Sequence, residues 1–193
     1  MKHCAKEIDM RALKYAILGL LMRHPMTGYE IAKEFNYELA EFWYANHSQI
    51  YPELKKLFEE ELVVYDIEIS GDILESKRYT ITDKGQEEFI QWLHRDEKIQ
   101  QTPKDIFRLR MYFSNNLDLQ TRIHLLENQR QQHIKRLNTL KKTSEQYPQT
   151  PAYDSDRFGD FIVLRGAIMR EENIIAWLNE CIHYSEEAMK QRK

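Results

Sequence analysis

The spacing of apolar residues changes twice within residues 10–95, and this order limits the folds open to the chain. Steps of three and four, typical of a helix with one buried face, recur over residues 10–23, after residue 27 and over residues 48–61. Alternation typical of strands follows in residues 62–69 and 77–82, and the polar stretch around residues 70–72 indicates a hairpin between them. A fourth helix is expected after Thr82.

Local signals place the ends of these helices. Pro25 ends the first helix, because proline disfavours helical geometry in the residue before it. Thr27 and Glu30 form a capping box that opens the second helix. Ser48 is expected to be the N-cap of the third helix. The third helix is expected to turn four apolar residues inward: Ile50, Leu54, Leu57 and Phe58.

Three helices, a hairpin and a further helix, in this order, predict a winged helix-turn-helix, in which the third helix enters the DNA major groove and the hairpin is the wing. The fold class is therefore mainly α: three helices, a two-stranded wing and a linking helix, followed by a domain of long helices. We expect a DNA-binding domain at residues 1–95 and a C-terminal domain at residues 96–193. Residues 1–9 indicate no role.

The C-terminal domain is expected to hold two long amphipathic helices, one capped by Asp118 and one starting near Ser155. Their apolar seams are interrupted by Arg130 and His133 in one helix and by Glu171 in the other. Two such stripes favour a partner, most simply a second copy of the chain, so a homodimer is predicted. The alternative is an intrachain helical hairpin packed on the first domain.

Composition excludes several classes of protein. The apolar stretches are too short for a membrane helix, so no membrane partner and a cytoplasmic location are expected. The sequence has no phosphate-binding glycine loop, no metal-ligand spacing and no nucleophile beside a base, so no enzyme, no cofactor and no metal are predicted.

The outer face of the third helix carries side chains suited to DNA. Gln49 is suited to adenine, Tyr51 to a phosphate or a thymine methyl, and a pair of lysines to phosphates. The expected DNA contacts are Lys14, Thr27, Tyr29, Ser48, Gln49, Tyr51, Lys55, Lys56, Lys77 and Arg78. Residues 1–95 nevertheless carry 12 Lys and Arg against 17 Asp and Glu, a net charge of −5. That charge leaves open a winged-helix adaptor that binds proteins without DNA.

Four ordered segments resemble the PadR family of bacterial transcriptional regulators: residues 13–21 (LKYAILGLL), 27–31 (TGYEI), 47–57 (HSQIYPELKKL) and 77–85 (KRYTITDKG). Residues 105–113 and 170–178 resemble the C-terminal helices of the phenolic-acid-responsive subgroup. The resemblance implies a homodimeric repressor that binds a palindromic operator in double-stranded DNA and is released by a small molecule. For the phenolic-acid-responsive member of that subgroup, the signal is a phenolic acid such as p-coumarate and the regulated gene is a phenolic acid decarboxylase. The resemblance implies the same circuit here, and a PadR-type regulator with a different signal is an alternative.

A hydroxycinnamate needs an apolar slot, a polar partner and a cation. Residues of these kinds are expected where the two domains meet: Trp92, Phe107, Arg108, Arg110, Tyr112 and Phe113. Each has another interpretation, because aromatic residues at helical spacing often form core and arginines often pair with surface acids.

Overall fold

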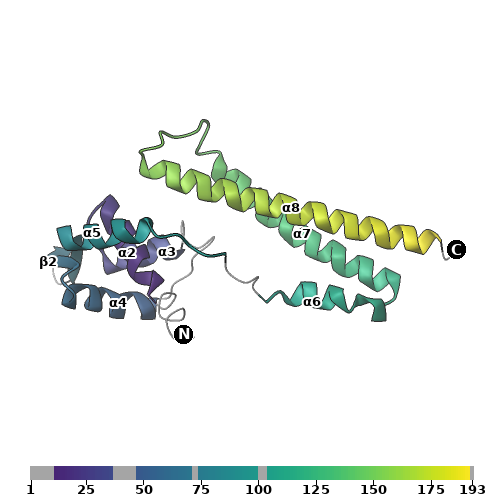
Figure 1. Ribbon diagram of the computed structural model, residues 1–193, viewed down its shortest axis with the longest axis horizontal. Helices are drawn as coiled ribbons and strands as arrows, with labels where there is room; N and C mark the ends of the chain where they lie inside the picture. The colour runs from purple at the N-terminus through teal and green to yellow at the C-terminus, as the bar shows by residue number, and fades with distance from the viewer. Residues whose placement is uncertain (1–10, 37–46, 71–73, 100–103, 192–193) are drawn as a thin grey trace. The chain divides into compact units, whose positions relative to one another are not determined.

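The computed structural model describes residues 11–36, 47–70, 74–99 and 104–191. The chain divides into two compact units, Met1–Ile99 and Gln100–Lys193 (Figure 1). Residues 1–9, for which the sequence indicated no role, lie outside the described residues.

The first unit has the predicted order of elements. It contains α2 (Ala12–Arg23), β1 (Met26–Thr27), α3 (Gly28–Asn36), α4 (His47–Glu59), β2 (Val63–Ser70), β3 (Leu74–Ile81) and α5 (Asp83–Leu93). Helix α2 ends at Arg23 because His24, which precedes Pro25, is extended with φ −167° and ψ 159°. Thr82 caps α5, since its side chain accepts a hydrogen bond from the amide of Gly85.

The sheet has three strands in the order β1-β3-β2, one more than the sequence predicted. In the added strand β1, Met26 pairs with Tyr79 and Thr27 with Arg78. A strand of two residues is too short to show alternation, so no periodicity could reveal it. Strand β3 also starts at Leu74, three residues before the predicted start at Lys77.

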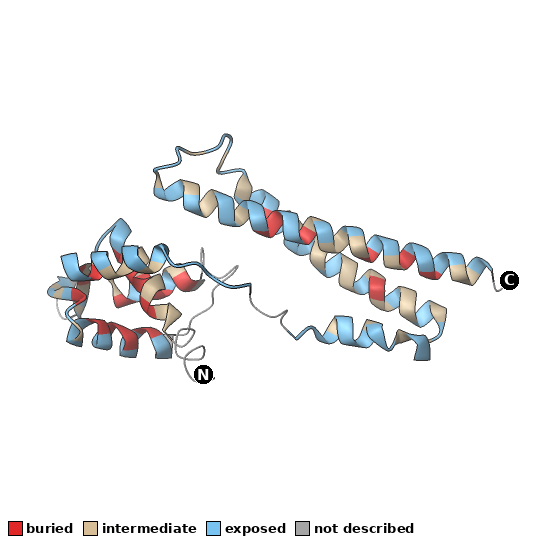
Figure 2. Cartoon of the chain, in the orientation of Figure 1, coloured by how far each residue is buried: buried red, intermediate tan, exposed pale blue. Residues whose placement is uncertain are grey.

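The core of the first unit lies where α2, α3, α4 and the sheet meet, and Figure 2 shows the buried stripe on these helices. Helix α4 buries Ile50, Leu54 and Leu57 completely, as predicted. Phe58 was expected to join them, and that expectation is wrong: its side chain is 44% exposed. Its ring instead lies beside that of Tyr65 on the wing, with the centroids 4.9 Å apart. The core faces one side of α4 and leaves the other side free for a site.

The second unit is helical. It contains α6 (Ile106–Tyr112), the short 3-10 helix η2 (Ser114–Asn116), α7 (Leu119–Ser144) and α8 (Asp156–Lys190). Asp118 caps α7 as predicted, because its Oδ1 accepts a hydrogen bond from the Thr121 amide at 2.8 Å. Helices α7 and α8 pack along each other as a hairpin, which Figure 1 shows in green and yellow.

The two predicted seams meet each other inside this hairpin. Leu126, Leu178 and Ile182 form one buried cluster, and Leu140, Ala167 and Ile168 form a second. Between the clusters, His133 Nδ1 lies 2.5 Å from Glu171 Oε2, and Glu171 is only 4% exposed. His133 and Glu171, which interrupt the two seams, are thus partners, while Arg130 donates a hydrogen bond to Asn179 on α8.

The seams therefore pack against each other within one chain. Large apolar side chains on α6 and α8 remain exposed even so: Ile106, Leu109, Ile162, Val163 and Met169. None of the described helices is long and apolar enough to cross a membrane.

Candidate nucleic-acid interface

A groove runs between the outer face of α4 and the β2–β3 hairpin. Its lining includes Thr27, Gly28, Tyr29, Tyr51, Lys55, Phe58, Glu59, Tyr65, Glu75, Ser76, Lys77 and Tyr79. Five of the ten predicted DNA contacts, from α4, the wing and the start of α3, therefore line one surface. Three aromatic residues of the lining, Phe58, Tyr65 and Tyr79, were not among the predicted contacts.

The wing has two faces of different chemistry. Tyr65 pairs with Tyr79 and Ile67 with Lys77, while the intervening pair is Asp66 with Arg78. Because alternate strand residues point to opposite faces, Tyr65, Lys77 and Tyr79 share the groove side, and Asp66 and Glu68 share the other. The two-residue spacing of Lys77 and Tyr79 was the signal that could have placed Tyr79 in the site.

Lys77 remains exposed on the groove side of the wing, as a phosphate contact requires. Its Nζ lies 4.0 Å from the ring centroid of Tyr65. A hydrogen bond with Tyr65 raises the pKa of Lys77, so the ammonium stays charged. The ring therefore holds a cation at the edge of the groove.

Both lysines of α4 lie on its exposed face. The Lys55 side chain is 78% exposed, with Nζ 3.7 Å from Glu59, and the Lys56 side chain is 58% exposed, with Nζ 3.9 Å from Glu53. The pair of Lys55 with Glu59 is exposed and contributes only about 0–1 kcal/mol, so a phosphate can replace Glu59 at little cost, whereas Glu53 is buried and keeps its contact with Arg11.

Arg78 has other partners and does not fit the phosphate role predicted for it. Its Nε lies 2.5 Å from the Glu68 carboxylate, and its NH1 donates to Glu30 at 3.1 Å and to the Pro25 carbonyl at 3.0 Å. The hydrogen bonds to Glu68 and Glu30 raise the pKa of Arg78. The guanidinium therefore holds the wing to the start of α3 from the face opposite the groove.

The capping box predicted at the start of α3 is confirmed. The Thr27 amide donates to Glu30 Oε2 at 2.7 Å, and the Glu30 amide donates to Thr27 Oγ1 at 3.2 Å. The hydrogen bond from the Thr27 amide and the nearby Arg78 lower the pKa of Glu30. Thr27 lines the groove while its hydroxyl caps α3, and Tyr29 beside it is 68% exposed.

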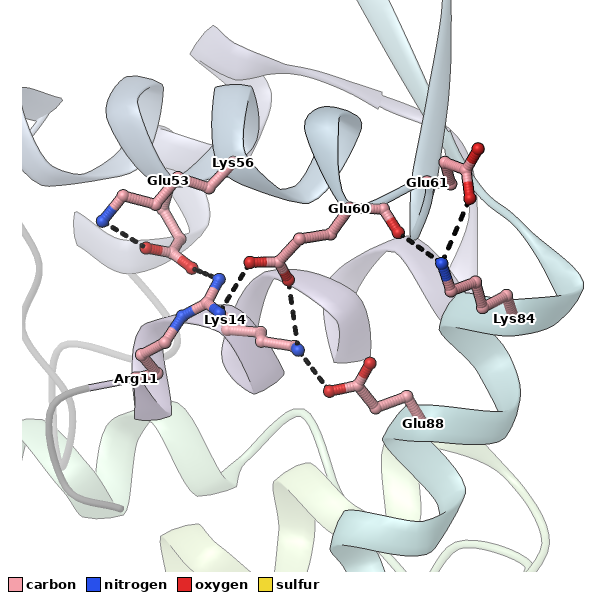
Figure 3. A network of polar contacts seen from close by, with 8 residues as sticks. All are labelled: Arg11, Lys14, Glu53, Lys56, Glu60, Glu61, Lys84 and Glu88. Atoms are coloured by element: carbon pink, nitrogen blue, oxygen red, sulfur yellow. Dashed lines mark hydrogen bonds and ion pairs between the residues drawn. The ribbon is translucent and has the colours of Figure 1, made fainter. Parts of the chain in front are cut away.

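Lys14 is buried, and its expected contact with the DNA backbone is wrong. The residue is 6% exposed, and its ammonium forms ion pairs with Glu60 at the end of α4 and with Glu88 on α5 (Figure 3). The charged end of Lys14 can point inward because the carboxylates of Glu60 and Glu88 bind it there.

Arg11 extends this network to α4, which is the predicted third, or recognition, helix of the helix-turn-helix. Its guanidinium donates to Glu53 at 2.8 Å and to Glu60 at 2.7 Å (Figure 3). Burial opposes ionisation of Glu60, but the hydrogen bond and charge of Arg11 outweigh it and lower the pKa of Glu60. Arg11 and Lys14 thus fix the inner side of α4, which leaves its outer side for a ligand.

The start of α4 differs slightly from the prediction. The helix begins at His47, so Ser48 lies in the first turn and is not the N-cap. Ser48 and Gln49 are both exposed, and Tyr51 is 49% exposed. The side chains expected to face bases therefore lie on the outer surface.

The predicted effector residues are divided between the two units. Trp92 belongs to the first, where its ring stacks on Tyr15 with centroids 4.7 Å apart. In the second unit, Phe107 packs against the core of the hairpin and meets Trp177 edge-on. Phe107 therefore serves as core, which was the alternative interpretation.

The other predicted effector residues lie on the surface of α6 and just after it. Arg108 lies over the Trp177 ring at 5.6 Å and pairs with Asp105 at 3.3 Å. Tyr112 and Phe113 contact each other edge-on, and both are exposed, as is Arg110. Among the described residues, no group of three or more His, Cys, Asp or Glu is placed to hold a metal ion.

A recognition helix whose outer face lines a groove with a two-stranded wing defines a winged helix-turn-helix protein. Residues 17–91 match the transcriptional regulator PadR-like family. Residues 103–185 match the family described as virulence activator alpha C-term. The two matches fall on the two units of the structure.

Two transcriptional regulators match this chain across almost their whole lengths. The chain is 42% identical to the negative transcriptional regulator PadR of Bacillus subtilis over 176 residues, which is 90% of this chain and 97% of the relative. It is 28% identical to the probable transcriptional regulator Rv1176c of Mycobacterium tuberculosis, over 88% of this chain and 95% of that one. The chain belongs to the PadR family of transcriptional regulators.

Solved structures of the Bacillus subtilis protein have the same fold. The crystal structure of PadR in complex with operator DNA matches with a TM-score of 0.86 and 40% identity, over 90% of this chain and 98% of that one. The structure in complex with p-coumaric acid matches with a TM-score of 0.81 and 38% identity, with the same coverage. These relatives are regulators, in agreement with the expectation that the chain is not an enzyme.

Proposed function

We propose that this chain is a homodimeric transcriptional repressor that binds a palindromic operator, is released by a small phenolic acid such as p-coumarate and controls a phenolic acid decarboxylase gene. The observation that carries the proposal is the match to the Bacillus subtilis protein, a negative regulator solved with operator DNA and with p-coumaric acid. The match covers 97% of that protein, including both units. A cytoplasmic location is part of the proposal, because the operator is there.

Residues 1–95 are the proposed DNA-binding domain. The groove between α4 and the wing supports this assignment, because it combines an exposed recognition face with cations at its edge. Ser48, Gln49 and Tyr51 are proposed to face bases, and three lysines, Lys55, Lys56 and Lys77, to hold phosphates. Thr27 and Tyr29 line or flank the same surface as backbone contacts.

Residues 96–193 are the proposed dimerisation and effector-response domain. The exposed apolar residues of α6 and α8 support a second copy as the partner, since burying them stabilises the dimer by about 25 cal/mol per Å². A dimer also presents two recognition helices, which a palindromic operator requires.

The effector is proposed to bind near α6. Tyr112, Phe113 and Arg110 are exposed there and supply an aromatic surface, a phenol and a cation. Arg108 and Trp92 are retained as candidates, and Phe107 acts through packing. A bound acid would release DNA by favouring a state of the dimer in which the two wings no longer match the half-sites.

The decisive experiment uses fluorescence anisotropy with the DNA upstream of the phenolic acid decarboxylase gene that the chain is proposed to control. The full chain should bind that DNA more tightly than a scrambled duplex, and p-coumarate should release it. Benzoate serves as the control ligand, because it lacks the phenol. Specific binding without release at millimolar p-coumarate would discard the phenolic acid and retain a PadR-type repressor answering another signal.

A second candidate is a winged-helix adaptor that binds protein and not DNA. The net charge of −5 in residues 1–95 favours it, because non-specific DNA affinity depends on cations. Heparin chromatography across a salt gradient separates the two, since an adaptor with that charge should not be retained.

A further inference from the structure

Gly28, the first residue of α3, lies directly against the ring of Tyr51 on the recognition helix. A Cβ placed on Gly28 would come within 2.6 Å of Tyr51 Cε1 and 3.1 Å of Tyr51 Cζ. Contacts below 3.0 Å force an atom to move, so any side chain at position 28 would displace the Tyr51 ring. Gly28 is itself buried, whereas half of the Tyr51 surface remains exposed.

The backbone at position 28 gives no other reason for glycine. Its φ lies outside the left-handed range, where side chains are disfavoured, and the residue is helical. Helix propensity does not favour glycine either, because alanine is the better helix former by about 1 kcal/mol in a helix interior. The requirement for glycine at position 28 therefore comes from α4, whose Tyr51 ring lies against Gly28.

We propose that Gly28 is a positioning residue for DNA recognition: the space left by its missing side chain fixes the direction in which Tyr51 leaves α4. Both residues line the groove between α4 and the wing, so a shift of this ring changes the surface presented to an operator. This inference rests on the proposed DNA-binding function. It adds that the start of α3, which carries the capping box, determines the orientation of the Tyr51 side chain on the recognition helix.

The test compares Gly28→Ala, Tyr51→Ala and the double variant in the full chain, using anisotropy with the upstream DNA and single-base variants of it. Each single variant should weaken binding by about tenfold, the effect expected for one base contact, and both should lose preference at the same operator position. The double variant should bind no more weakly than Tyr51→Ala, because alanine at position 28 has nothing left to displace.

Gly159→Ala is the matched control, because a Cβ there meets nothing within 4 Å. It should leave affinity and base preference unchanged. If Gly28→Ala folds poorly, the double variant should recover its melting temperature, because the overlap with the ring is gone.

The outcomes separate this inference from the proposed function. Wild-type chain that does not prefer the upstream DNA would overturn both. Specific wild-type binding combined with an unchanged Gly28→Ala variant would overturn the inference alone. Equal loss from Gly28→Ala with and without Tyr51 would also overturn it, since Gly28 would then act through close approach to the DNA backbone.

Discussion

Arg78 on β3 binds the carboxylate of Glu30 at 3.1 Å, and so joins the wing to the residue that caps α3. The same guanidinium binds Glu68 on β2 and the Pro25 carbonyl. This cation, which faces away from the groove, thus adds side-chain contacts between the wing and the start of α3 to the strand pairing of Met26 and Thr27 with β3.

Replacing Arg78 and replacing its neighbour Lys77 should therefore have different effects. Arg78→Ala should lower the melting temperature, because Glu30 and Glu68 lose their partner, while the salt dependence of DNA binding keeps its slope. Lys77→Ala should leave the melting temperature unchanged and reduce the salt slope by about one unit, the effect of one lost phosphate contact. Anisotropy titrations at several salt concentrations measure the slope. A reduced slope for Arg78→Ala would restore its phosphate role.

The Glu30 contacts also predict a dependence of stability on pH. The hydrogen bond from the Thr27 amide and the contact with Arg78 lower the pKa of Glu30 in the folded chain. They therefore stabilise the fold above the unfolded pKa of about 4.3, and this contribution is lost as pH falls through the lower folded value. Urea unfolding between pH 6 and pH 3 should show a smaller loss for Glu30→Gln than for the wild type. Equal losses in the two proteins would contradict the linkage.

Lys14 and Lys55 provide a second matched pair. Lys14→Ala should lower the free energy of unfolding by about 2 kcal/mol, because Glu88 loses its ion pair with Lys14 and Glu60 keeps its pair with Arg11, while both carboxylates are about one-third exposed and so partly screened by water. The salt slope should not change. Lys55→Ala should reduce the salt slope and leave the free energy of unfolding unchanged, because the Lys55 side chain is 78% exposed. A stable Lys14→Ala variant with weaker DNA binding would contradict the assignment.

These lysines and arginines show what the sequence could and could not predict. Apolar spacing and capping residues indicated the helices, the wing and the outer face of α4, because those signals are local. They did not separate Lys77 from Arg78, since that distinction needs the strand register that places Glu30 and Glu68 beside one side chain. Nor did they reveal Lys14 as buried, because Glu60 and Glu88 lie 46 and 74 residues away in the sequence.

The second unit shows the same limit. His133 and Glu171 were each identified as an interruption in an apolar seam, but a helical period does not fix how one helix is aligned along another. Their contact depends on the alignment of α7 and α8, which the clusters on either side of it set. The effector region was the least predictable part, because aromatic residues such as Phe107 have the same spacing whether they form core or a pocket.

The contact between His133 and Glu171 can be tested with a pair of apolar replacements. His133→Leu alone should lower the free energy of unfolding by about 2 kcal/mol, because Glu171 stays buried and loses its contact with His133 while the Arg136 contact remains. His133→Leu combined with Glu171→Met should recover most of that loss, since it continues both apolar seams. Thermal unfolding at one protein concentration measures the cycle. Additive losses would mean that the two side chains do not act as a pair.

Gln49 is expected to contact a base. Gln49→Ala should cost about 1–3 kcal/mol of operator affinity and relax preference at one position, because a bidentate contact with adenine is lost. Lys56→Ala is the control, since loss of a phosphate contact weakens all sequences alike. A library of single-base operator variants distinguishes the two patterns. Identical profiles for the two variants would show that Gln49 does not read a base.

The last prediction concerns α8. Ending the chain before Ser155 removes the helix against which α7 packs, and exposes Leu126 and Leu140, each 2% exposed in the folded chain. Burying a leucine contributes about 1.5–3 kcal/mol, so the truncated chain loses both the hairpin and the apolar surface proposed for the dimer. Light scattering should therefore show a monomer or aggregates, and binding to the upstream DNA should weaken because two half-sites are no longer held together. A chain ending at Lys190 is the control, because it keeps α8 whole. A soluble, tightly binding dimer without α8 would place the dimer contact elsewhere in the chain.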